Sequence, residues 1–128
     1  MKHTEFELQK SICKYLDLKY PNVLYLSDTI ASVKLTLPQA ARNKSIQKQG
    51  FKCPDLLILQ PNDAYYGLFI ELKKESPYKK SGGLKKCDHL EAQNKTIEDL
   101  MLKGYFACFS WTYEGTIKII EDYLSNNL

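Results

Sequence analysis

The sequence predicts an α/β fold in which helices flank a mixed β-sheet, with the elements in the order α-β-α-β-β-α-β-α. Apolar residues recur every three to four positions near both ends of the chain, which is typical of amphipathic helices. Short apolar runs rich in β-branched and aromatic residues lie between these segments and favour strands. No linker or internal repeat divides the 128 residues, so we expect a single domain over residues 1–128.

The first helix is expected over residues 5–19, where Leu8, Ile12 and Leu16 recur at helical spacing and Pro21 follows. Residues 4–7 (TEFE) match a capping box, in which the threonine and the second glutamate satisfy each other's backbone N–H groups. Glu5 falls on the same side of this helix as the three apolar residues. A carboxylate that points along a packing face needs an explanation.

A short strand is expected over residues 22–27, followed by a polar, basic helix over residues 38–49 with Gly50 just past its end. Residues 55–60 and 65–73 are two apolar, β-prone runs. The turn-forming sequence PND at residues 61–63 separates them, so we expect a hairpin.

The second half of the chain begins with residues 74–86, which contain five lysines, two glycines and a proline and are expected to form a mobile basic loop. A helix over residues 88–103 follows, with Gly104 at its C′ position. A strand over residues 105–111 and an amphipathic helix over residues 116–124 complete the prediction.

Composition excludes several classes of protein. With 44% hydrophobic and 26% charged residues, the chain is globular rather than disordered or fibrous. Its apolar runs are far shorter than the roughly 18 residues of a membrane-spanning helix, and we expect neither a membrane span nor a secretion signal. The four cysteines form no CxxC pair, which favours reduced thiols in a cytoplasmic protein.

Charge is distributed unevenly along the chain. Residues 34–86 hold eleven basic and four acidic residues, a balance of +7, whereas the net charge of the whole chain is +3. Such a basic stretch attracts phosphates. The alternative is that lysine-rich loops are simply solvated.

The predicted hairpin brings acidic residues together. A hairpin centred near Asp63 pairs positions whose numbers sum to about 126, which sets Asp55 opposite Glu71. Strand alternation places Glu71 and Lys73 on one face with Phe69. A one-residue shift of register would separate these side chains.

Carboxylates at the end of so apolar a strand are costly to desolvate unless a cation or another charged group accompanies them. Mg²⁺ meets this requirement, because it binds through one or two carboxylates while waters and substrate phosphate complete its shell. The alternative is a cross-strand ion pair between these acids and Lys73.

These residues resemble a known family. Pro54-Asp55 followed by Glu71-Leu72-Lys73 resembles the PD-(D/E)xK nuclease signature, and the surrounding sequence is similar to the small VRR-NUC domains of that superfamily. The resemblance covers nearly the whole chain. It includes Glu5 and Gln9 on the opening helix, residues 50–57, the strand at 67–73, and residues 90–93 on a helix that ends at Gly104-Tyr105. Cys53 departs from the pattern, where a small glycine-like residue is expected.

The resemblance implies a restriction-endonuclease-like fold and a role for each matching residue. Asp55, Glu71 and the carbonyl of Leu72 are implied metal ligands, and Lys73 is the implied catalytic lysine. Gln93 is implied as a helper near the nucleophile, and Glu5 as an outer or second-metal acid.

The resemblance also implies an activity: a Mg²⁺-dependent DNA endonuclease, with Mn²⁺ as a substitute, that cuts branched, flap or four-way (Holliday) junction DNA as a homodimer. A short nuclease of this kind suits a bacterial or phage genome. Five loop lysines are candidates for binding the nucleic acid: Lys74, Lys79, Lys80, Lys85 and Lys86.

Two other functions stay open on the sequence. One is a non-catalytic nucleic-acid-binding module, in which the acids form ion pairs and the basic stretch follows the phosphate backbone. The other is an RNA-cleaving enzyme of the same fold.

Overall fold

A four-stranded mixed sheet forms the centre of the protein in the computed structural model, which describes residues 4–27 and 35–128. The strands are β1 (Tyr25–Ser27), β2 (Leu56–Ile58), β3 (Leu68–Leu72) and β4 (Phe106–Ser110), in that order across the sheet. β1–β2 and β2–β3 pair antiparallel, whereas β3–β4 pair parallel. The mixed sheet predicted from the sequence is therefore confirmed.

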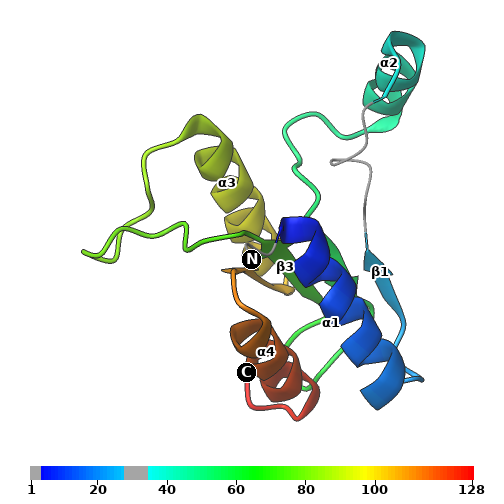
Figure 1. Cartoon of the computed structure of the whole chain (residues 1–128), viewed down its shortest axis with the longest axis vertical. Coiled ribbons are helices and arrows are strands. Elements are labelled where there is room, and N and C mark those ends of the chain that lie inside the picture. The colour runs from blue at the N-terminus through cyan, green and yellow to red at the C-terminus, as the bar shows by residue number, and fades with distance from the viewer. Residues whose placement is uncertain (1–3, 28–34) are drawn as a thin grey trace.

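Four described helices accompany the sheet, and their bounds are α1 (Glu5–Lys19), α2 (Leu37–Ile46), α3 (Asp88–Leu102) and α4 (Tyr113–Leu124). The predicted order α-β-α-β-β-α-β-α is confirmed. α1 and α4 pack together on one face of the sheet, and α3 covers the other (Figure 1). The expectation of a single domain stays a prediction.

Strand alternation in β3 divides the apolar side chains between two cores. Leu68, Ile70 and Leu72 are buried against residues of α1 and α4. Phe69 packs on the other side against a smaller cluster that includes Ile97 and Leu100 of α3. Each fully buried aliphatic side chain contributes roughly 1.5–3 kcal/mol, so both layers hold β3 in a fixed orientation.

The turn between β2 and β3 is fixed by its own asparagine and by the end of α4. The Asn62 side-chain oxygen accepts hydrogen bonds from the backbone N–H of Ala64 and Tyr65, at 2.9 and 2.7 Å. The Asn62 amide donates to the Tyr123 carbonyl at 3.0 Å, and the Tyr123 hydroxyl donates to the Gln60 carbonyl at 2.7 Å. These contacts restrict the turn and therefore the register of the hairpin.

The opening helix forms as the sequence predicts. Thr4 and Glu7 make both hydrogen bonds of the capping box, and α1 spans the expected residues. Leu8, Ile12 and Leu16 are buried. Glu5, one turn earlier, is exposed and lines the pocket described below.

Several predicted bounds are wrong by a few residues. The second helix ends at Ile46 instead of residue 49, and none of its residues is buried, so no packing extends it. Gly50 adopts a φ of +81° in a turn after the helix instead of directly ending it. The last helix begins three residues early because Thr112 caps it, its side chain accepting a hydrogen bond from the Gly115 N–H.

The strands are shorter than predicted, because the residues at the ends of the predicted runs do not pair in register with a neighbouring strand. β1 begins at Tyr25 instead of residue 22, and β2 has three residues. β3 and β4 each have five residues, so the tyrosines at 65 and 66 and the tryptophan at 111 lie outside them.

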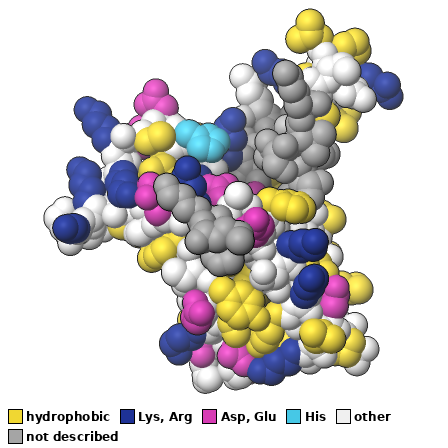
Figure 2. Space-filling model, in the orientation of Figure 1, with side chains coloured by type: hydrophobic (Ala, Val, Ile, Leu, Met, Phe, Trp, Pro, Cys, Tyr) yellow, Lys and Arg dark blue, Asp and Glu magenta, His cyan; other side chains and the backbone are white. Residues whose placement is uncertain are grey.

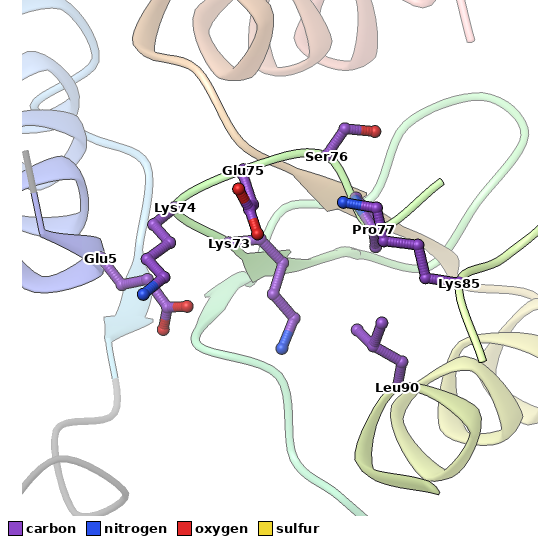
Figure 3. Close-up of a pocket in the computed structure, with 8 residues that line it drawn as sticks. All are labelled: Glu5, Lys73, Lys74, Glu75, Ser76, Pro77, Lys85 and Leu90. Atoms are coloured by element: carbon purple, nitrogen blue, oxygen red, sulfur yellow. The ribbon is translucent and has the colours of Figure 1, made fainter. Parts of the chain in front are cut away.

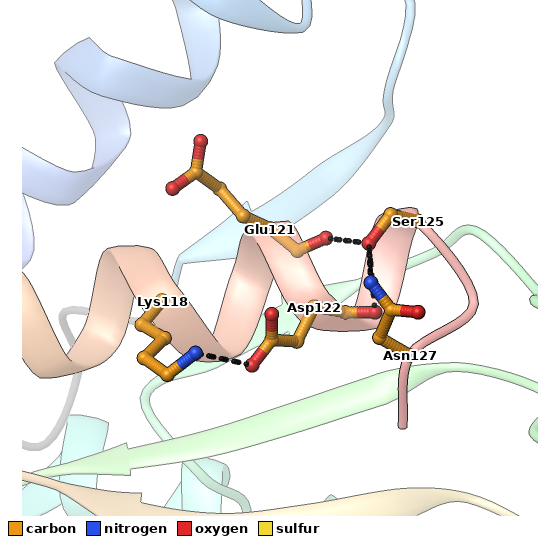
Figure 4. A network of polar contacts seen from close by, with 5 residues as sticks. All are labelled: Lys118, Glu121, Asp122, Ser125 and Asn127. Atoms are coloured by element: carbon orange, nitrogen blue, oxygen red, sulfur yellow. Dashed lines mark hydrogen bonds and ion pairs between the residues drawn. The ribbon is translucent and has the colours of Figure 1, made fainter.

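Side-chain contacts also hold the end of α4 together. Lys118 pairs with Asp122 one turn on, and the Ser125 hydroxyl donates to the Glu121 carbonyl at 2.7 Å (Figure 4). The Asn127 amide donates to Ser125 at 3.0 Å. These exposed contacts lie on the helix whose end fixes the hairpin turn.

Two further findings concern the chain as a whole. None of the helices in the described part of the chain is long and apolar enough to cross a membrane. All four cysteines lie in the described ranges, and none of them forms a disulfide.

Gly104 provides a test of the turn between α3 and β4. Its φ is +96°, and a Cβ at this position would lie 2.6 Å from the Tyr66 ring. We expect Gly104→Ala to lower the free energy of unfolding by about 1–3 kcal/mol, from backbone strain and this clash. Urea unfolding followed by circular dichroism measures the change. Gly83→Ala is the matched control, because a Cβ there meets nothing within 4 Å; equal losses in both variants would contradict this interpretation.

Candidate active site

Asp55 and Glu71 face each other across the β2–β3 hairpin. The last observed pair at this end of the hairpin is Leu56 with Ile70, and Asp55 and Glu71 are the next residues on each side. The register is the one predicted from the sequence. Glu71 is on the α3 side of the sheet, because its neighbours Ile70 and Leu72 face the core formed with α1 and α4.

Backbone N–H directions show which of the two kinds of antiparallel pair Asp55 and Glu71 form. In the non-hydrogen-bonded kind, the two opposed side chains lie closer together. The Leu72 N–H donates to Asp55 Oδ2 at 2.8 Å, toward β2, whereas the Lys73 N–H donates to the Ser110 carbonyl at 2.8 Å, toward β4. By alternation the backbone of Glu71 also points toward β4. Asp55 and Glu71 therefore occupy a non-hydrogen-bonded position of the antiparallel pair.

Gln9 of α1 fixes the backbone of Asp55. Its side-chain amide donates to the Asp55 carbonyl at 3.2 Å and to the Ser27 hydroxyl at 2.6 Å. One glutamine thus connects α1, the end of β1 and the start of β2. The sequence indicated Gln9 as part of the family resemblance but gave it no role; its signal was its position one turn after Glu5.

Gln93 of α3 holds Glu71 from the opposite layer. Its Nε2 donates to Glu71 Oε1 at 2.6 Å, and the exposed fractions of the two side chains are 7% and 6%. Gln93 Oε1 is buried and has no hydrogen-bond partner among the described residues. Buried polar atoms rarely stay unpaired, so this oxygen is available to accept a hydrogen bond from a ligand or water.

Burial shifts the pKa of both carboxyl groups upward. Desolvation, followed by repulsion from Asp55, raises the pKa of Glu71 from its ordinary 4.5 to about 8. Desolvation also raises the pKa of Asp55, although the hydrogen bond from the Leu72 N–H opposes this. The pair therefore retains a proton near neutral pH unless a cation replaces it.

An open pocket lies at the end of β3, and Lys73 lines it, whereas Asp55 and Glu71 do not. Lys73, Lys74 and Lys85 line it together with Glu5 from the start of α1 and Leu90 from α3 (Figure 3). Lys73 lowers the pKa of Asp55 and of Glu71 by attraction, whereas Glu5 raises both by repulsion. Lys73 and Glu5 are therefore close enough to act electrostatically on the acids.

The donor set suits a hard divalent cation. In the described ranges, no group of three or more His, Cys, Asp or Glu residues is arranged to hold a metal. The Asp55–Glu71 pair nevertheless fits Mg²⁺, which usually binds to proteins through one or two carboxylates and keeps several waters. Zinc is a poorer fit, because its sites use three or four protein ligands, most of them histidine nitrogen or cysteine sulfur.

Comparison with known proteins identifies the fold. No family model matches the sequence, and no curated protein matches it. A solved structure described as a VRR_NUC domain protein superposes with a TM-score of 0.66 at 22% sequence identity, over 98% of this chain and 91% of the other. The chain has the VRR-NUC fold.

Within this VRR-NUC fold, the five candidate nucleic-acid-binding lysines lie on one exposed segment, residues 74–86. Lys74 and Lys85 line the pocket, whereas Lys79, Lys80 and Lys86 do not. Basic side chains gather on the projection that this segment forms (Figure 2). The segment, expected to be a mobile loop, contains an antiparallel bridge between Tyr78 and Leu84.

The raised pKa of Glu71 predicts how the stability of the metal-free protein depends on pH. The unfolded chain loses this proton near pH 4.5, whereas the folded protein keeps it up to about pH 8. The folded state therefore binds more protons in this window, and stability falls as the pH rises through it. We expect a loss of at least about 1 kcal/mol in urea unfolding between about pH 5 and about pH 8.5, measured in chelator.

Glu71→Gln is the variant that isolates this effect. It removes the titrating group, so the decline should be smaller, with Asp55 left as the remaining contributor. A wild-type stability that stays flat or increases over this pH range would contradict the prediction.

Proposed function

We propose that the protein is a metal-dependent endonuclease that hydrolyses phosphodiester bonds in DNA. The observation that carries this proposal is the pair of opposed, desolvated carboxylates, Asp55 and Glu71, with Lys73 two residues after Glu71 and directly after β3. The VRR-NUC fold supports a nuclease-type domain. The resemblance of Pro54-Asp55 and Glu71-Leu72-Lys73 to the nuclease signature adds the same function on independent grounds.

Asp55 and Glu71 would hold a Mg²⁺ ion, with Mn²⁺ as a substitute. When bound, the ion lowers the pKa of water and stabilises the charge that develops on the phosphate. The Leu72 carbonyl is the proposed third ligand. Support comes from the Leu72 N–H, which points to Asp55, because the N–H and C=O of one strand residue share a direction.

The other residues would bind the phosphate and orient the attacking water. The Lys73 ammonium, which lines the pocket and acts electrostatically on both acids, would stabilise negative charge on the phosphate oxygens. Gln93 Oε1, buried and without a described partner, would accept a hydrogen bond from the water. Glu5 lies at the edge of this pocket, where it would add a carboxylate to a second or outer ion.

Lys74, Lys79, Lys80, Lys85 and Lys86 would bind the substrate backbone through its phosphates. All five are exposed on one segment next to the pocket, which supports the proposal. By the family resemblance, the substrate would be branched, flapped or four-way-junction DNA. Electrostatic contacts of this type bind without reading sequence.

Substitution of the site tests the proposal. Asp55→Ala, Glu71→Ala and Lys73→Ala should each lower the cleavage rate by about a hundredfold or more, since each removes charge that acts on the reacting phosphate. Lys103→Ala, also a removed charge but exposed at the end of α3 and outside the pocket, should change the rate by less than about threefold. The measurement is a gel assay on labelled duplex, flap and four-way-junction DNA with Mg²⁺, Mn²⁺ or chelator.

Two outcomes would contradict the nuclease. Folded Asp55→Ala and Lys73→Ala variants that cut as fast as the parent would refute the assignment of the site. Tight, salt-sensitive DNA binding without cleavage under any metal would instead support a non-catalytic binding module. Cleavage of RNA in preference to DNA would assign an RNA substrate to the same site.

We further propose that the protein acts as a homodimer, which would place two active sites on one branched substrate. Exposed apolar residues support this proposal: Leu37 and Ile46, at the two ends of α2, are 87% and 83% exposed. Figure 1 shows α2 standing away from the sheet.

Light scattering after size-exclusion chromatography tests the homodimer. We expect a mass of twice the 14.8 kDa of one chain, because burying exposed apolar surface favours association. A mass of one chain at every protein concentration, with and without junction DNA, would contradict it.

A further inference from the structure

Two exposed aromatic rings lie beside the candidate active site and take no part in the proposed chemistry. Trp111 and Tyr78 have ring centroids 5.9 Å apart with an interplanar angle of 66°. Their exposed fractions are 37% and 38%, so each ring is partly packed and partly open to solvent. Large aromatic side chains that stay open in this way are candidate contacts for a ligand.

Trp111 is the neighbour of Lys73 on the same face of the sheet. The parallel pair Leu72–Ser110 ends the β3–β4 ladder, and the Lys73 N–H continues it by donating to the Ser110 carbonyl. Trp111 follows Ser110 directly. By alternation with Phe109, which packs in the cluster on the α3 side, Trp111 faces the side of the sheet that holds Glu71.

Tyr78 is held in place by its surroundings. Its ring contacts Phe109 edge-on at 6.2 Å, and its backbone pairs with Leu84, which packs against the same cluster. A backbone hydrogen bond from the Lys85 N–H to the Pro77 carbonyl, 2.9 Å long, closes the base of this hairpin. A ring held this way loses little further freedom when a ligand stacks on it.

The pocket lysines lie close to the two aromatic rings along the chain. Pro77, directly before Tyr78, lines the same pocket as Lys73, Lys74 and Lys85. A ligand that fits both features has an anionic group for the lysines and a flat π-face for the rings. A nucleic-acid strand with an unpaired base has both, whereas the bases of an intact duplex are already stacked and covered.

We propose that Trp111, supported by Tyr78, is a stacking platform for an unpaired nucleobase next to the phosphate bound by the pocket lysines. This inference rests on the proposed function and deepens it, because it defines the substrate as a strand with at least one unpaired nucleotide beside the cleaved bond. Stacking does not read the base identity, so the platform is selective for strand structure and not for sequence.

Trp111 is the single tryptophan of the sequence, so its fluorescence reports on the platform directly. The wild-type protein is titrated in chelator with oligothymidylate and, separately, with a blunt duplex of equal length. We expect the single strand to quench the fluorescence and to bind at least several-fold tighter than the duplex in the same salt. No quenching, or equal quenching by both, would overturn the proposal.

Variants provide the second measurement, with binding followed by the anisotropy of a labelled oligothymidylate in chelator. Trp111→Leu should weaken binding about tenfold, in line with the loss of one stacked base, and Trp111→Phe should retain most of it. Tyr66→Leu is the matched control, an exposed aromatic that precedes the opposite end of β3. Equal affinity of Trp111→Leu and wild type would overturn the platform.

The two proposals fail in different ways. The titration uses no metal and no cleavage, so it does not depend on the proposed metal ligands Asp55 and Glu71. Quenching by single strand in a protein that cuts nothing would support the platform and refute the nuclease. Cleavage of DNA without quenching would support the nuclease and refute the platform.

Discussion

The opposition of Asp55 and Glu71 across one antiparallel pair is the constraint on which the rest of the site depends. Two carboxyl groups at a non-hydrogen-bonded position, with their pKa values raised by burial, oppose folding unless they share a proton or a cation. The protein maintains this arrangement from both layers. Gln9 on α1 holds the backbone of Asp55, and Gln93 on α3 holds the side chain of Glu71. The helices therefore position the acids while the strands bring them together.

The sheet also explains why charges of opposite sign meet at one end of the molecule. β3 runs parallel to β4, so the C-terminal ends of both strands lie at the same end of the sheet, and the residues that follow them lie side by side. Lys73 follows β3 and Trp111 follows β4. Glu71 lies near the C-terminal end of β3, opposite Asp55, and the basic segment of residues 74–86 begins directly after this strand. A polar site forms there without interrupting the apolar residues of either core.

Much of this arrangement could be predicted from the sequence, because it depends on local patterns. Periodicity and the capping box placed α1, and the turn chemistry around Asn62 set the register that opposes Asp55 to Glu71. The strand bounds were less predictable, because pairing partners and not residue preferences decide where a strand ends. The contacts of Gln9 and the role proposed for Trp111 were not predicted either. Both depend on which helix or strand packs beside the residue in the folded protein, and local sequence patterns do not indicate such neighbours.

The contact between Tyr123 and the β2–β3 turn has a consequence for how the protein is made. The hairpin that opposes the acids comes from the middle of the sequence, but β4 and α4, which complete its sheet and hold its turn, come from residues 106–124. Contacts so distant along the chain are slow to form, because loop-closure entropy opposes them. During translation, the turn that sets the register of Asp55 and Glu71 lacks its contacts with Tyr123 until α4 has been synthesised.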